Sequence, residues 1–159
     1  MEVNRVSGYQ NQQRLISPSF TALRIKEPQT WEKDVLDSFV KNKEVQKIVK
    51  SFENIGVDLS AMRGEKEFPV TADNIFLWDD KHKMIISNIL VNKDNKNFSY
   101  GAVSTNIKQF DTPKPLNAKN FFNYLLKKYD FSFDHSISDS QIHKVIKKVV
   151  DKAAESELQ

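Results

Sequence analysis

The feature that most constrains the fold is a series of short apolar segments, separated by polar turns, between Val57 and Thr105. Apolar segments of about four to eight residues with polar residues between them are typical of β-strands in a meander. Sequences with helical periodicity lie on both sides of this region. The order predicts an α+β fold in which an antiparallel sheet packs against helices.

The expected strands fall at residues 57–61, 68–70, 75–78, 84–91 and 98–102. Pro69 indicates an edge position for the second segment, because proline cannot donate a hydrogen bond to a sheet ladder. Residues 75–78 are all apolar, which favours an inner strand that is covered on both faces. Polar turns are expected at Gly64 and at residues 79–83 and 92–97. We expect an antiparallel β-meander of about four strands.

One long N-terminal helix is expected after Thr30, which is a favourable N-cap residue. Its apolar residues recur at helical spacing, and the stripe is weakened only where Lys41, Asn42 and Lys43 interrupt it. Gly56 can end the helix, because glycine adopts the left-handed conformation of a C-terminal cap.

Two C-terminal helices are expected after the strands. Asn117 can cap the first helix, and Ser138 with Gln141 forms a capping box at the second. The helices should pack mainly on one face of the sheet. The expected core consists of Phe39, Ile48, Phe52, Leu77, Ile86, Leu90, Phe122, Leu125, Ile146 and Val149.

The chain is expected to divide into a mobile polar tail at residues 1–28 and a single α+β domain at residues 29–159. Within the tail, residues 19–25 alternate in a way that allows an edge strand. The tail lacks the apolar core of a secretory signal, which favours a cytoplasmic bacterial protein. The tail also resembles the secretion segments of bacterial effectors, which are poor in acidic residues. This resemblance implies export by a specialised secretion system as the alternative.

Composition excludes several classes of function. The chain has no cysteine, which excludes disulfides, iron–sulfur clusters, thiolate zinc sites and a cysteine nucleophile. Its four glycines are not clustered, so no phosphate-binding loop can be written from them. No apolar stretch approaches the roughly 20 residues that span a bilayer. We therefore expect no cofactor and no membrane partner.

Two clusters of polar side chains could carry chemistry. His135, Asp139 and His143 are four residues apart and would share one face of a continuous helix, as a metal-dependent hydrolase would require. If Ser138 is the N-cap, however, His135 lies outside that helix. Residues 79–82 contain two aspartates and a histidine, which could act as acid and base or could shape a hairpin turn.

Two further groups of residues suggest binding. Lys144, Lys148 and Lys152 lie one turn apart on the last helix and could contact nucleic acid. A net charge of +3, from 24 basic and 21 acidic residues, permits nucleic-acid binding without indicating it. Aromatic residues on a sheet face could instead bind another protein. The candidates for that surface are Phe76, Trp78, Phe98 and Tyr100.

Because no catalytic arrangement stands out, the sequence favours a non-enzymatic binding module whose partner is another protein. Nucleic-acid binding through the basic helix faces and metal-dependent hydrolysis are the alternatives.

Overall fold

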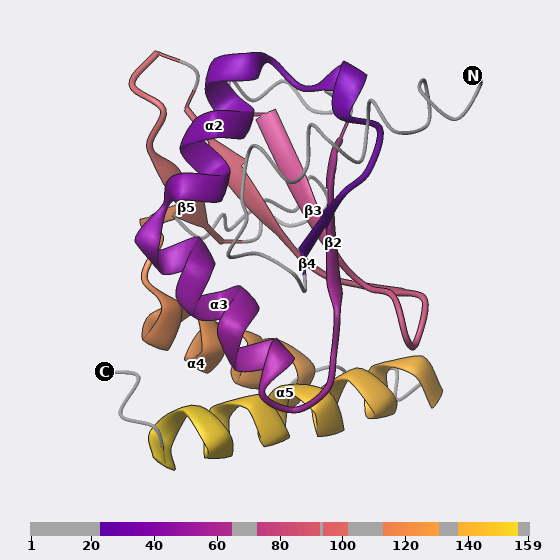
Figure 1. Ribbon diagram of the computed structural model, residues 1–159. Coiled ribbons are helices and arrows are strands. Elements are labelled where there is room, and N and C mark those ends of the chain that lie inside the picture. Colours follow the sequence, from indigo (N-terminus) through magenta and orange to yellow (C-terminus); the bar gives the residue numbers. More distant parts are fainter. Residues whose placement is uncertain (1–22, 65–72, 93, 102–112, 131–136, 156–159) are drawn as a thin grey trace, which may run out of the picture.

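The computed structural model describes residues 23–64, 73–92, 94–101, 113–130 and 137–155. They form a six-stranded sheet with helices packed against one face (Figure 1). The elements are β1 (Leu23–Ile25), the 3-10 turn η1 (Pro28–Thr30), α2 (Lys33–Lys41), α3 (Lys43–Glu53), β2 (Leu59–Arg63), β3 (Asp73–Asp79), β4 (Met84–Val91), β5 (Phe98–Tyr100), β6 (Lys114–Pro115), α4 (Ala118–Asp130) and α5 (Ile137–Glu155).

The strands lie in the sheet in the order of the sequence, and all pairs are antiparallel except β1 with β2, which are parallel. The predicted α+β fold is thus confirmed, but the sheet has six strands rather than about four. The additional strands are the edges β1 and β6, and β6, with only two residues, is too short to give a recognisable alternation. β1 coincides with the last three residues of the segment 19–25. The expected strand at residues 68–70 lies outside the described residues.

The single long N-terminal helix that the sequence predicts is in fact two helices, α2 and α3, separated at Asn42. The backbone of Asn42 is extended, with φ −66° and ψ 127°. Its side-chain oxygen accepts hydrogen bonds from the backbone N–H groups of Glu44 at 2.9 Å and Val45 at 3.1 Å. Asparagine is a strong N-cap because it satisfies these first unpaired donors. The interruption of the apolar stripe is therefore a helix boundary.

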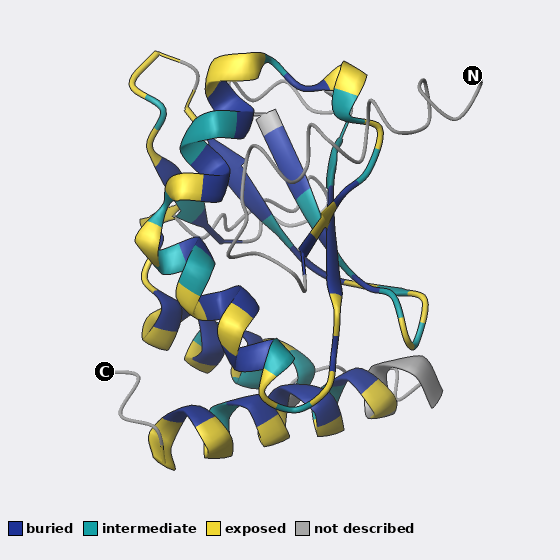
Figure 2. Ribbon diagram, viewed as in Figure 1, coloured by how far each residue is buried: buried dark blue, intermediate teal, exposed yellow. Residues whose placement is uncertain are grey.

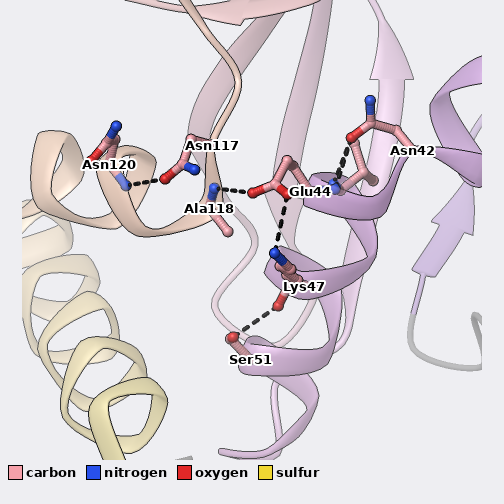
Figure 3. Close-up of polar contacts among 8 residues, drawn as sticks. Asn42, Glu44, Lys47, Ser51, Asn117, Ala118 and Asn120 are labelled. Atoms are coloured by element: carbon pink, nitrogen blue, oxygen red, sulfur yellow. Dashed lines mark hydrogen bonds and ion pairs between the residues drawn. The ribbon is translucent and has the colours of Figure 1, made fainter. Parts of the chain in front are cut away.

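The N-terminus of α4 is tied to α3 through a side chain distant in sequence (Figure 3). Glu44 Oε1 accepts a hydrogen bond of 2.8 Å from the backbone N–H of Ala118, while Glu44 Oε2 lies 3.2 Å from Lys47 Nζ. Asn117 Oδ1 accepts from the N–H of Asn120 at 3.0 Å, as its predicted capping role requires. A carboxylate here also interacts favourably with the positive end of the helix dipole.

The core lies between the sheet and the helices (Figure 2), and it contains all the residues predicted to form it except Leu90. Leu90 is buried as well, but its pairing with Asn74 places it on the opposite face of the sheet. Aromatic side chains connect the two layers: the rings of Phe39 and Phe98 are 5.5 Å apart, and those of Tyr100 and Phe121 are 5.8 Å apart. The register between β3 and β4 shifts through a bulge in β4, where Tyr129 donates a 2.6 Å hydrogen bond to the Ile86 carbonyl.

Candidate functional site

The sheet face opposite the helices presents a compact group of side chains on β1 to β4, which we call the outer face. The strand register aligns Arg24, Ser60, Trp78 and Ile85 in one row. Their neighbours along the strands, such as Leu59 and Leu77, point into the core. Because successive residues of a strand point to opposite faces, the row lies on the face away from the helices. The adjacent row contains Met62, Phe76 and Asn88.

Apolar side chains of the outer face remain accessible. Ile85 is 46% exposed and is the only large hydrophobic side chain in the described part of the chain that is classed as exposed. Met62, Phe76 and Trp78 are half-buried. Trp78 is paired with Ile85 across β3 and β4, and Phe76 is paired with Met62 across β2 and β3. Directly paired residues on one face are within contact distance of each other, so the four side chains form one patch.

Phe98 and Tyr100 do not contribute to this patch, contrary to the expectation of a surface with four aromatic residues. Each is only 5% exposed, and both pack against rings of the helix layer. Phe98 is paired with Val91, which is fully buried, so the register directs β5 inwards at these positions. Burial raises the pKa of the Tyr100 hydroxyl. The alternation showed that the two residues share a face, but it could not show which face.

A polar arrangement borders the patch at one end. Lys26 Nζ lies 4.9 Å from the centroid of the Trp78 ring and 3.8 Å from Asp80 Oδ1. The hydroxyl of Ser60 is 2.7 Å from both carboxylate oxygens of Asp80. Asp80 is thus held in place by Ser60, which is fully buried on β2, and by Lys26, which directly follows β1. A lysine over an aromatic face is attracted by the ring and restricts its orientation.

The cluster at residues 79–82 shapes the hairpin between β3 and β4. Asp79 is fully buried, and its Oδ1 accepts hydrogen bonds from the backbone N–H groups of Lys81 at 2.9 Å and His82 at 3.2 Å. Its Oδ2 lies 2.6 Å from His82 Nδ1. A carboxylate that satisfies turn donors in this way is typical of a hairpin loop. The contacts of Asp79 thus match the turn-forming interpretation.

Gly64 has a role on the outer face that the sequence did not indicate. Its N–H donates a 2.9 Å hydrogen bond to the Asn74 carbonyl and continues the pairing of β2 with β3, and the residues that follow it, 65–72, lie outside the described part of the chain. A Cβ atom at Gly64 would lie 2.3 Å from the Phe76 ring. Only glycine therefore leaves the ring in its observed position. Beside it, Asn88 donates to the side-chain oxygen of Asn74 at 3.0 Å.

The residues of the expected metal site are not brought together within the described part of the chain. His135 lies outside the described residues, as does the side chain of Asp139. His143 is half-buried on α5, which begins at Ile137. Among the described residues, no group of three or more histidine or acidic side chains could hold a metal ion. The metal site remains a prediction.

The expected basic residues Lys144, Lys148 and Lys152 are all exposed on α5. Asp151 and Glu155 are exposed on the same helix, and Lys152 Nζ lies 3.6 Å from Glu155 Oε2. Charges of both signs therefore share this surface. None of the helices in the described ranges has the length and apolar character needed to cross a bilayer.

Comparisons of the chain with protein families, with curated proteins and with solved structures found no match.

Proposed function

We propose that this protein is a non-enzymatic interaction module that binds another protein through the outer face of β2, β3 and β4. The observation that supports this most strongly is the exposed side chain of Ile85 next to Trp78 in the strand register. Tryptophan is among the residues that contribute most to protein interfaces, where it fills a desolvated centre surrounded by polar residues. Here Asn88 and Lys26 provide that polar surrounding.

The rigidity of the patch supports the same function. Trp78 is restricted by Lys26, and Phe76 lies against Gly64. Binding to side chains that are already ordered costs less conformational entropy than binding to mobile ones. A short peptide or a partner loop could therefore bind without rearranging the sheet.

Selection from a library of random peptides displayed on phage tests the proposal. Peptides recovered on the full-length protein should bind the Trp78→Ala variant at least about thirtyfold more weakly, which corresponds to about 2 kcal/mol for a central aromatic residue. The Ile85→Lys variant should bind about tenfold more weakly, and Ile85→Val should bind like the wild type. If peptides bind Trp78→Ala and Ile85→Lys as tightly as the wild type, the outer face is not the binding site.

Nucleic-acid binding is the second candidate function, and its support is the three exposed lysines on α5. It predicts binding of a random oligonucleotide at low salt that weakens steeply as salt rises. The Lys144→Glu and Lys148→Glu variants should reduce both the affinity and its dependence on salt. Equal binding by these variants would exclude α5 as the contact surface.

A further inference from the structure

We infer that the outer face binds an acidic protein segment, in which a carboxylate lies close to an aliphatic or aromatic side chain. In this arrangement the carboxylate pairs with Arg24 and the apolar side chain packs on Trp78 and Ile85. The inference rests on the proposed function and adds the chemistry of the partner.

The geometry allows one short segment to reach both features. Arg24, Ser60, Trp78 and Ile85 occupy successive strands in one row of the sheet. Neighbouring strands are about 4.8 Å apart, so Arg24 lies about 10 Å from Trp78 along the row. An extended chain covers about 3.3 Å per residue. A carboxylate about three residues from an apolar side chain therefore spans the distance, and closer spacings are within reach of the long arginine side chain.

The charges of this end of the sheet favour an anionic segment. Asp80 is already engaged by Ser60 and Lys26, and Asp79 by His82 and two backbone donors. These carboxylates therefore have internal partners. Arg24 is exposed, and within the described part of the chain it has no ion-pair partner.

The remaining exposed charges at this end are Asp58, Lys81 and Lys83, so their balance is also positive. Of these cations, Arg24 is the one that the strand register places in the same row as Trp78. Arginine is suited to this role because its planar group binds a carboxylate through two parallel hydrogen bonds.

The apolar part of the outer face favours a protein over a nucleic acid as the source of the anion. Ile85 and Met62 cannot stack with bases in the way that an aromatic platform does. A single free arginine also neutralises few phosphates, whereas nucleic-acid affinity depends on several such contacts. Aliphatic, aromatic and charged groups in one small area are what a mixed peptide segment matches.

Selection from the displayed peptide library is performed in parallel on the wild type, on Arg24→Glu and on Lys144→Glu, which makes the same charge reversal at an exposed site on α5. Wild type and Lys144→Glu should both enrich peptides that contain Asp or Glu within a few residues of Leu, Ile, Phe or Trp. Arg24→Glu should instead enrich peptides with Lys or Arg. A peptide selected on the wild type should bind Arg24→Glu about tenfold more weakly, and Arg24→Lys should recover part of that loss. Circular dichroism confirms that each variant is folded.

The possible failures of the two proposals are distinguishable. If wild-type peptides lose binding in Trp78→Ala but show no enrichment of acidic residues, the inference about the partner is wrong and the proposed function stands. If no selected peptide depends on Trp78 or Ile85, the proposed function is wrong as well. If a uridine oligonucleotide binds in a manner that depends on Trp78, the ligand is a nucleic acid and both proposals are overturned.

Discussion

Replacement of Asn42 by alanine should destabilise the protein, because the side chain caps α3 (Figure 3). Its oxygen accepts two hydrogen bonds, from the backbone N–H groups of Glu44 and Val45. Removal of an asparagine N-cap costs about 1 kcal/mol, within a range of about 0.5–2 kcal/mol. The upper half of that range applies here, since two donors lose their acceptor at once.

If α2 and α3 were one continuous helix, the change in stability on replacing Asn42 by alanine would have the opposite sign. In the middle of a continuous helix, alanine is better than asparagine by about 0.5 kcal/mol, so the same substitution would then be stabilising. Asn42→Ala therefore separates the observed helix boundary from the single helix that the apolar stripe predicts. Few substitutions give such a difference in sign from one measurement.

Urea unfolding followed by far-ultraviolet circular dichroism is the appropriate assay. With a denaturant dependence of about 2 kcal/mol per molar urea, a loss of about 1.5 kcal/mol lowers the midpoint by about 0.75 M. Asn42→Asp is the matched control, because aspartate keeps the acceptor and its charge favours the helix N-terminus, so its midpoint should stay near that of the wild type. An Asn42→Ala variant that is as stable as the wild type, or more stable, would refute the reasoning.

Three further predictions concern other contacts. Gly64→Ala should cost about 1–3 kcal/mol of unfolding free energy, because its Cβ would overlap the Phe76 ring, and Phe76→Ala in the same chain should recover most of that loss in a double-mutant cycle. Tyr129→Phe should cost about 1 kcal/mol in urea unfolding, because the carbonyl at the β4 bulge loses its hydroxyl donor. The Lys96 ammonium, 3.2 Å from the Asp34 carboxylate, lowers the pKa of Asp34, so Lys96→Met should raise that pKa in a titration followed by NMR. The stabilisation from this pair is present above the ordinary carboxyl pKa and is lost as the pH falls through the lowered value.

Hydrophobic periodicity predicted most of the strands and helices in the described part of the chain, and most of the residues that fill the core. Phe52 and Val149 are examples, since each lies on an apolar stripe at helical spacing and each is fully buried. Periodicity depends on several residues in succession, so it gave no indication of β6, and it indicated β1 only as part of a longer possible edge strand at residues 19–25. It also did not predict the helix boundary at Asn42, because an N-cap is a single residue whose effect depends on the backbone around it.

The outer face was harder to predict than the core. Which of two strand faces is covered depends on the register between strands, and register is a property of residues distant in sequence. Trp78 and Phe98 are both aromatic residues of predicted strands, yet only Trp78 lies on the outer face. No sequence pattern identified Arg24 and Ile85 as site residues, because only the strand register places them in the same row as Trp78.

The parallel pairing of β1 with β2 has a consequence for how the proposed site is assembled. Residues 26–58 lie between these strands, and this is the longest connection within the sheet. The chain must close that loop before Arg24 reaches its row, whereas Trp78 and Ile85 are joined by a short hairpin. Release of the edge strand would leave an apolar patch without its cation. Charge selectivity at the outer face would therefore depend on a three-residue strand, while adhesion to apolar groups would not.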